Sequence, residues 1–313
     1  MWQPEPVVFA GLGAVGCSYA AAMQEAGVDV WALAGGERAK QLEQGVVLNG
    51  GRTLHFPLLS PGETAKAPAG LLIFAVKFYA LPAAIEDARA CVGRDTVILS
   101  LLNGVGAEEL LQRAFPENTV LYGRVAGLTA NRTAGQLERG TLGRWQLGLE
   151  KNDPNALHPA VSGCLSLCRA ANIPASAPAD MLHAVWWKLM ANAGLNQCSA
   201  VLRAPYGVFQ TVPEARSMLL AAMEEVRLAA PAAGVTLLPE EADEYLALID
   251  RMEPWGKTSM LQDVEAGRQT EVDVLAGSVL RYGKRLGVKT PVNQFLLWQI
   301  KALTAMAQSR KIH

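Results

Sequence analysis

A cation and two amides recur at every fourth position between Trp186 and Asn196. Steps of four residues advance only about 40° around an α-helix, so Lys188, Asn192 and Asn196 are predicted to share one stripe. Their neighbours are largely apolar, and a polar row on such a helix is costly unless a ligand, water or partner group satisfies it. The spacing predicts the wall of a binding site, in which an ammonium group can stabilise negative charge and supply a proton. The alternative is an exposed lysine beside two solvated amides.

A second polar cluster follows in the segments 257–263 and 268–273. Ser259 can donate a hydrogen bond to a carboxylate, and Glu271 can accept one from a substrate hydroxyl or orient a lysine. Thr258 and Thr270 are each candidate N-caps of a following helix. Without the lysine stripe, the same residues are typical of helix caps and exposed surface.

The segment 7–16 runs from a β-branched, apolar strand pattern into three glycines with the spacing G-x-G-x-x-G. In a dinucleotide site, the first glycine permits a tight turn, the second lets the backbone approach a pyrophosphate, and the third lets the helix pack on the strand. The pyrophosphate then lies on the N–H groups at the helix N-terminus. The alternative is a merely tight turn. The predicted cofactor-binding residues here are Gly11, Leu12, Gly13, Ala14, Val15 and Gly16.

The end of the second predicted strand, Leu33–Gly36, indicates which dinucleotide is bound. NAD-binding relatives of this architecture carry a carboxylate there that bonds the ribose 2′-hydroxyl. This chain has none, and Arg38 follows within reach of a 2′-phosphate. The pattern therefore favours NADP(H), although Glu37 lies beside Arg38 and the alternative is a solvated surface arginine.

Two further polar residues follow predicted strands: Lys77 after 70–76 and Asn103 after 97–102. Ligands of open α/β sheets bind outside the carboxyl ends of the strands. Lys77 is predicted to contact a phosphate or ribose of the cofactor, and Asn103 the nicotinamide ribose or the substrate. Gly104 and Gly106 permit close backbone approach. Read alone, a lysine and an asparagine at such places are ordinary loop residues.

Short apolar runs alternate with helical patterns in the first half of the chain, which predicts a parallel sheet with crossover helices. The runs are 7–10, 28–33, 70–76, 97–102 and 119–123. Strand patterns at 136–138 and 145–149 lack intervening helices and are predicted to be antiparallel additions at the sheet edge. After a helix at 159–171, the segment 172–178 contains two prolines and reads as an extended linker.

The second half is dominated by a helical period, and we predict helices at 180–198, 214–233, 239–249, 274–286 and 293–307. The expected domains are 1–174 and 175–313. The apolar stripes of the predicted helices are expected to form a core, with one face available for a homodimer. The predicted fold class is α/β, with an N-terminal doubly wound sheet and a C-terminal all-α domain.

Composition excludes several functional classes. The 313 residues are 50% hydrophobic and 18% charged with a net charge of −1, so no overall attraction to nucleic acid or anionic membrane is expected. Five scattered cysteines without C-x-x-C pairs are expected to be reduced core residues. We see no leader and no apolar run of about 20 residues, which favours a cytoplasmic protein.

Taken together, these segments resemble the ketopantoate reductase family, the 2-dehydropantoate 2-reductases. Six matches follow in the family's order: G-x-G-A-x-G at Gly11–Gly16, the strand-end Lys77, N-G-x-G at Asn103–Gly106, W-x-K-L-x-x-N-x-x-x-N around Lys188, Thr258–Asp263, and T-E-x-D at Thr270–Asp273. The resemblance implies a Rossmann domain, an all-helical domain like that of 6-phosphogluconate dehydrogenase relatives, NADP(H) as cofactor, and a 2-oxo acid as substrate. No metal is expected.

By motif position, Lys188 is implied to be the general acid and Glu271 its partner or that of a substrate hydroxyl. Asn103, Asn192, Asn196 and Ser259 are implied to be substrate or cofactor contacts. The implied reaction is reduction of 2-dehydropantoate to pantoate, a step of pantothenate and coenzyme A biosynthesis. Reduction of another 2-oxo acid is the first alternative, and a non-catalytic nicotinamide sensor the second.

The chain departs from the family pattern at two places. Members often carry an arginine nearer the end of the second strand than Arg38 lies here. Gln197 occupies a position where relatives commonly have proline.

Overall fold

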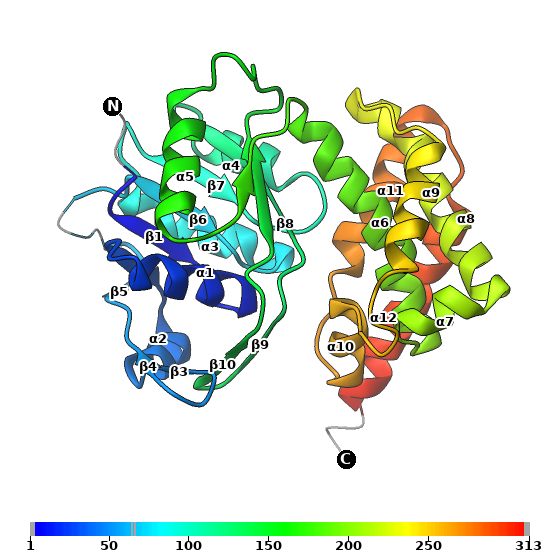
Figure 1. Cartoon of the computed structure of the whole chain (residues 1–313), viewed down its shortest axis with the longest axis horizontal. Coiled ribbons are helices and arrows are strands. Elements are labelled where there is room, and N and C mark those ends of the chain that lie inside the picture. Colours follow the sequence, from blue (N-terminus) through cyan, green and yellow to red (C-terminus); the bar gives the residue numbers. More distant parts are fainter. Residues whose placement is uncertain (1–3, 64, 66, 310–313) are drawn as a thin grey trace. The chain divides into compact units, whose positions relative to one another are not determined.

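The computed structural model describes residues 4–63, 65 and 67–309 (Figure 1). The chain divides into two compact units, one of residues 1–102 and 106–182 and one of residues 103–105 and 183–313. The short segment Asn103–Val105 thus belongs to the second unit, although the residues on either side of it in the chain belong to the first.

The first unit is built on an eight-stranded sheet with the order β12-β11-β8-β7-β6-β1-β2-β5. Six strands, β8 to β5 in that order, run parallel, as predicted, because apolar runs buried on both faces suit a sheet covered by helices on each side. The strands are β1 (Val7–Ala10), β2 (Val30–Leu33), β5 (Leu58–Leu59), β6 (Leu71–Phe74), β7 (Val97–Ser100), β8 (Val120–Ala126), β11 (Arg144–Gly148) and β12 (Ala175–Ser176).

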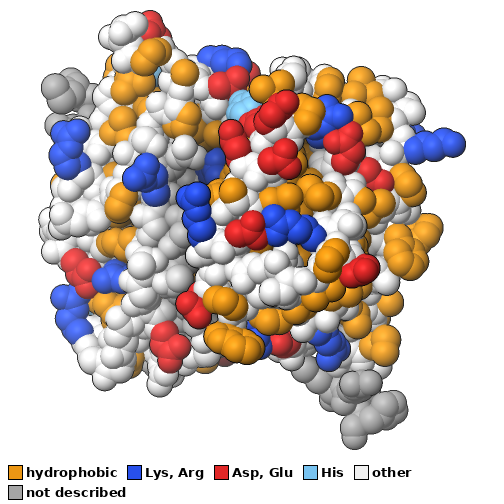
Figure 2. All heavy atoms as spheres, turned by 45° about the vertical axis from the view of Figure 1, so that its right-hand side comes forward, with side chains coloured by type: hydrophobic (Ala, Val, Ile, Leu, Met, Phe, Trp, Pro, Cys, Tyr) orange, Lys and Arg blue, Asp and Glu red, His pale blue; other side chains and the backbone are white. Residues whose placement is uncertain are grey.

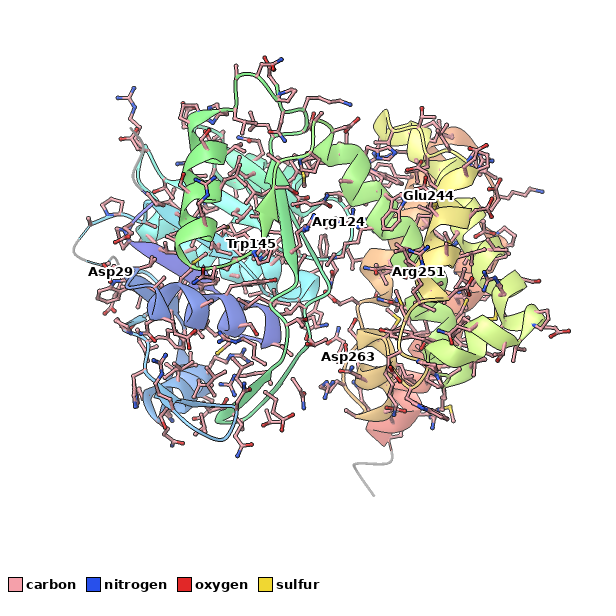
Figure 3. The ribbon with its side chains drawn as sticks, in the orientation of Figure 1. Asp29, Arg124, Trp145, Glu244, Arg251 and Asp263 are labelled. Atoms are coloured by element: carbon pink, nitrogen blue, oxygen red, sulfur yellow. The ribbon has the colours of Figure 1, made fainter. Side chains whose placement is uncertain are left out.

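Helices cover both faces of this sheet, and alternate residues of β1 show how. Val7 and Phe9 belong to the apolar core that also holds residues of α1 and α5, whereas Val8 and Ala10 belong to the core with residues of α3 and α4. In the first core, Trp145 of β11 packs edge to face on Tyr19 at 4.7 Å between ring centroids (Figure 3). The helices are α1 (Ala14–Glu25), α2 (Gly36–Glu43), α3 (Leu81–Ala88), α4 (Ala107–Ala114) and α5 (Pro159–Ala170).

One expectation about the sheet edge needs correction. β11 is an antiparallel addition, as predicted, but the strand at 136–138 is not part of this sheet. It is β10 (Gln136–Arg139), which pairs antiparallel with β9 (Ala130–Thr133) and parallel with β3 (Val46–Leu48). β4 (Thr53–Leu54) completes this four-stranded sheet. β10 is held there by Leu137, whose side chain is fully buried in the core that also contains residues of α1.

The expected linker is also part of the first unit. Residues 172–178 are extended around β12, as predicted, but β12 pairs in parallel with β11 and so extends the sheet. The main-chain N–H of Trp145 donates to Pro174 O at 2.8 Å, which holds the start of this segment in place.

The second unit is helical, as predicted. Two of its helices are too short to carry a clear period: α7 is not predicted, and α10 is indicated only by its candidate N-cap, Thr258. Gly194 of α6 lets α8 approach closely: a Cβ at this position would lie 2.6 Å from Met223 Cγ. The helices are α6 (Met181–Leu202), α7 (Tyr206–Thr211), α8 (Pro213–Ala229), α9 (Glu240–Ile249), α10 (Ser259–Glu265), α11 (Val272–Leu286) and α12 (Pro291–Ser309).

All five cysteines are buried and free, as expected for small core residues. Burial raises the pKa of the Cys168 and Cys198 thiols to about 12, so both are protonated at neutral pH. Among the described residues, no helix combines the length and apolar character needed to cross a bilayer.

Glu108, in the first turn of α4, is a buried carboxyl and predicts a pH-dependent stability. Burial above all, and the nearby charge of Glu109, raise the pKa of Glu108 from 4.5 to about 7. The folded chain binds this proton more tightly than the unfolded chain, so protonation of Glu108 stabilises the fold. This contribution to the free energy of unfolding is full below pH 4.5 and is lost as the pH rises through about 7. The contribution amounts to up to about 3 kcal/mol.

Glu108→Gln removes this titration. We expect the Tm of the variant to exceed that of the wild type by more at pH 8 than at pH 5, measured by thermal unfolding of both proteins in matched buffers. Parallel Tm curves across this range would contradict the assignment.

Candidate functional site

The polar stripe predicted on α6 is present. Lys188, Asn192 and Asn196 are half-buried, while the residues between them, from Leu189 to Ala191 and from Ala193 to Leu195, are buried. The helix therefore faces apolar packing around most of its circumference and leaves one strip of polar side chains partly accessible. Asn192 and Asn196 line a hollow of the second unit.

Two other helices contribute to this hollow, each through residues four positions apart. α10 supplies Ser259 and Asp263, and α11 begins beside Glu271, which lines the hollow together with Leu275. Residues at i and i+4 lie on the same helix face, so each helix presents one face to the same space.

Asn103 completes the lining, and the adjacent glycine explains how it is held there. Gly104 has a φ of +86°, and a Cβ at this position would lie 2.7 Å from Val274 Cγ2 on α11. Only glycine fits this turn without strain. The turn brings Asn103 Nδ2 to 3.2 Å from Glu271 Oε2, so the amide donates a hydrogen bond to the carboxylate of a residue that is only 9% exposed.

Asp263 is a lining residue that the sequence interpretation did not assign (Figure 3). Its carboxylate is buried and accepts a hydrogen bond from Arg268 Nε at 2.8 Å, and Arg268 N donates to Asp263 O at the same distance. The four-residue spacing from Ser259 was the signal available for it, but that signal required knowing that residues 259–265 form a helix.

The chemistry of the hollow is that of a polar-ligand site. Amide groups and the Ser259 hydroxyl can donate hydrogen bonds to a carboxylate or carbonyl oxygen, while Asp263 and Glu271 can only accept them when ionised. A small molecule that carries both an acidic group and a hydroxyl matches this combination.

Of the two candidate N-caps, one is confirmed. The Thr258 hydroxyl accepts from Leu261 N at 3.1 Å and caps α10, which places Ser259 in the first turn. Thr270 does not cap α11, because Glu271 holds the N-cap position there, with no hydrogen bond from its side chain to the helix. The Glu271 carboxylate is directed instead to Asn103.

The glycine turn of the first unit combines close backbone packing with open space at the start of α1. A Cβ on Gly16 would lie 2.0 Å from Gly11 O, so the turn and the start of α1 pack backbone to backbone. A Cβ on Gly13, the N-cap of α1, would meet nothing within 4 Å. No side chain caps this end and the first turn holds no acidic residue, so its N–H groups can bind an anion. Leu12 is buried, and Ala14 and Val15 are half-buried.

The residues just before Lys77 contact the glycine turn. Ala75 N donates to Ala10 O at 2.9 Å, and a Cβ on Gly11 would contact both Ala75 and Val76. Lys77 follows them, half-buried, where β6 ends. Arg38 is exposed in the first turn of α2, which begins at Gly36 after the end of β2. Each thus lies on a loop or helix start at the carboxyl end of a strand.

No group of three or more His, Cys, Asp or Glu side chains that could hold a metal occurs among the residues that the structure describes.

Comparison with known families shows a match along most of the chain. Residues 7–151 match the family described as ketopantoate reductase PanE/ApbA, and residues 180–304 match its C-terminal region. The 2-dehydropantoate 2-reductase of Streptococcus pyogenes serotype M6 is 28% identical over 305 residues, covering 96% of this chain and 98% of that protein. The protein of the same name from Pyrobaculum aerophilum is 31% identical over 246 residues, covering 77% and 79%.

Solved structures show the same fold. The 2-dehydropantoate 2-reductase of Geobacter metallireducens GS-15 superimposes with a TM-score of 0.82 at 28% identity and covers 95% of this chain and 99% of its own. A D-mandelate dehydrogenase in ternary complex with NADH and anilino(oxo)acetate gives a TM-score of 0.85 at 22% identity, with coverage of 96% and 99%. The predicted combination of a doubly wound sheet and an all-α domain is confirmed.

Proposed function

The chain belongs to the ketopantoate reductase family and is thus a nicotinamide-dinucleotide-dependent oxidoreductase, and we propose that it reduces 2-dehydropantoate to pantoate with NADPH. The observation that supports this most is the hollow lined by Asn103, Asn192, Asn196, Ser259 and Glu271. Every substrate contact implied by the sequence resemblance is among its lining residues. The reaction belongs in the cytoplasm, where five free thiols remain reduced.

The cofactor is proposed to bind at the glycine turn, with its pyrophosphate on the N–H groups at the start of α1. The open space above Gly13 and the close packing of Gly16 support this. Lys77 and Arg38 add positive charge at the ends of β6 and β2. When bound, NADPH supplies the hydride that reduces the ketone carbon.

Lys188 is proposed as the general acid. Its ammonium group donates a hydrogen bond to the ketone oxygen, stabilises the negative charge that develops there, and transfers a proton from Nζ to form the hydroxyl. The position of Lys188 one turn before Asn192, on the same face of α6, supports this role, because Asn192 lines the hollow.

The other lining residues are proposed to hold and orient the substrate. The amides of Asn192 and Asn196 and the hydroxyl of Ser259 donate to its oxygen atoms. Glu271 accepts from its hydroxyl or holds the lysine, and Asn103 fixes the Glu271 carboxylate through their 3.2 Å hydrogen bond. Because a near-attack geometry requires such fixed contacts, this part of the site contributes orientation to the rate.

Glu271→Gln tests the carboxylate. The amide keeps the size of the side chain but loses its charge and half of its acceptor capacity, so we expect kcat/KM for the 2-oxo acid to fall about tenfold or more. Initial rates measured by NADPH absorbance give this ratio. Glu265→Gln, an exposed carboxylate on α10 that pairs with Lys257, is the control and should leave kcat/KM unchanged. An unaltered kcat/KM in the Glu271 variant would contradict the role.

The decisive experiment for the proposed function is a panel of 2-oxo acids assayed with NADPH and with NADH in parallel. 2-Dehydropantoate should give the highest kcat/KM, and NADPH should be the better reductant. A higher kcat/KM for another 2-oxo acid would assign the alternative reductase activity. Cofactor binding without turnover of any 2-oxo acid would instead indicate a nicotinamide sensor.

A homodimer formed through the helical unit is proposed as the assembly. α12 carries exposed Phe295, Trp298 and Met306, and Figure 2 shows apolar side chains gathered in groups on the surface. Exposed apolar patches of this kind mark interaction sites. A ketopantoate reductase from Staphylococcus aureus with the same fold is described as dimeric.

A further inference from the structure

Arginine side chains gather on one face of the small sheet, where it packs on α1. Arg132 of β9 lies directly opposite Leu137 of β10 in the antiparallel pair, so both side chains leave the sheet on the same face. Leu137 is fully buried in the core that contains Cys17 of α1. Arg139, two residues after Leu137, is on this face too and donates to Ser18 O of α1 at 3.2 Å.

Arg132 therefore reaches the first turn of α1, immediately after the glycine turn. Cys17 marks this place, since its N–H closes the first helical hydrogen bond to Gly13 O at 2.9 Å. Burial raises the pKa of the Cys17 thiol, and Arg132, which interacts with that thiol, opposes the shift together with the charges of Arg38 and Arg139. Three guanidinium groups thus contribute positive charge at Cys17, in the first turn of α1.

Only one of the three is neutralised by an ion pair within the described residues. Arg139 pairs with Glu25 at 3.1 Å, and Glu25 also pairs with Arg52. None of the described ion pairs includes Arg132 or Arg38. Arg132 donates to the carbonyl oxygens of Thr133 and Gln136 in its own hairpin, but its buried Nε has no hydrogen-bond acceptor within the described residues.

The location of these charges matches the ribose end of a dinucleotide. β1 and β2 are in register from Val7 and Val30 to Ala10 and Leu33, so the glycine turn and the end of β2 lie side by side. In dinucleotide-binding folds of this type, residues at the end of the second strand contact the 2′ position of the adenosine ribose. Figure 1 shows β9 and β10 extending from the main sheet toward β3, β4 and α2, the helix that carries Arg38.

The end of β2 itself offers no cation, since Leu33 is followed by Ala34, Gly35 and Gly36. Gly36 has a φ of +56° and open space where a Cβ would stand. Glu37, the next residue, pairs with Lys40 at 2.6 Å.

We propose that Arg132, together with Arg38, binds the 2′-phosphate of NADPH and sets the preference of this chain for NADPH over NADH. A phosphate dianion takes two guanidinium partners readily, because their planar forks match its oxygen atoms. One of the two phosphate-binding residues, Arg132, thus comes from the small sheet, far along the chain from the glycine motif. The inference rests on the proposed use of NADPH.

Equilibrium binding of NADPH, NADH and 2′,5′-ADP by isothermal titration calorimetry tests this assignment without requiring turnover. Arg132→Gln should lower the affinity for NADPH and 2′,5′-ADP about tenfold or more and leave that for NADH within about twofold, since only the phosphate contact is lost. Arg132→Lys, which keeps the charge, should lose less. Arg38→Gln should show the same selectivity.

Arg52→Gln is the matched control. Arg52 is an exposed arginine just before β4 of the small sheet, pairs with Glu25, and is not one of the three arginines whose charges act on Cys17. It should leave all three affinities unchanged. Equal losses for NADPH and NADH in Arg132→Gln, or no loss at all, would overturn the inference while leaving the proposed reductase intact. If the wild-type protein binds neither dinucleotide, the proposed function itself fails.

Discussion

Lys188→Ala is expected to lower kcat by at least about a hundredfold while leaving the affinity for NADPH close to that of the wild type. The substitution removes the proton donor and the positive charge that stabilise the alkoxide, and neither contributes to holding the dinucleotide at the glycine turn. Steady-state rates at saturating substrate give kcat, and titration of NADPH gives its dissociation constant. The split between the two separates a catalytic role from a structural one.

Two further variants sharpen this test. Lys284→Ala removes an exposed lysine from the last turn of α11 and should leave kcat unchanged. Lys188→Arg retains a cation but hardly gives up its proton at neutral pH, so it should retain substrate binding with a low kcat. A turnover number that survives Lys188→Ala would refute the assignment of the general acid.

The parts of the fold predicted well from sequence are those set by local pattern. The glycine turn is predicted because strand, turn and helix are consecutive in the chain, and the helix predicted at 239–249 is α9, Glu240–Ile249. The polar stripe of α6 followed from a spacing of four. In each case the interactions that decide the structure lie within a few residues.

The parts predicted poorly depend on contacts between distant segments. Nothing near β10 in sequence indicates that it pairs with β3, about 90 residues earlier. The same is true of β12, because the prolines on either side of it predict a linker whereas the strand pairs with β11. Asp263 could be placed in the hollow only once α10 was known to be helical.

Gln197 shows how tertiary contacts account for a departure from a family pattern. It is fully buried, and its amide donates to Ala193 O at 2.7 Å and to Asn293 Oδ1 at 2.9 Å. Asn293 in turn donates to Glu225, which also accepts from the N–H groups of Val292 and Asn293 at the start of α12. A proline could not make these bonds, so in this chain α6 is tied to α8 and α12 through its side-chain amide.

Gly13→Ala is expected to weaken binding of both NADPH and NADH without lowering the stability of the fold. The backbone at Gly13 has a φ of −73°, which alanine adopts readily, and its Cβ would meet no protein atom within 4 Å. That empty space is where the pyrophosphate is proposed to approach, so the methyl group would collide with the ligand instead. A forced contact of this kind costs about 1–3 kcal/mol, or roughly tenfold to a hundredfold in the dissociation constant.

Gly16→Ala is the informative partner of this variant. Its Cβ would lie 2.0 Å from Gly11 O within the protein, so we expect a lower Tm even in the absence of cofactor. Thermal unfolding without ligand and dinucleotide titration of the two variants distinguish a collision with the ligand from a collision within the fold. If Gly13→Ala binds both dinucleotides as the wild type does, the pyrophosphate does not lie on this turn, and the cofactor must be placed elsewhere on the first unit.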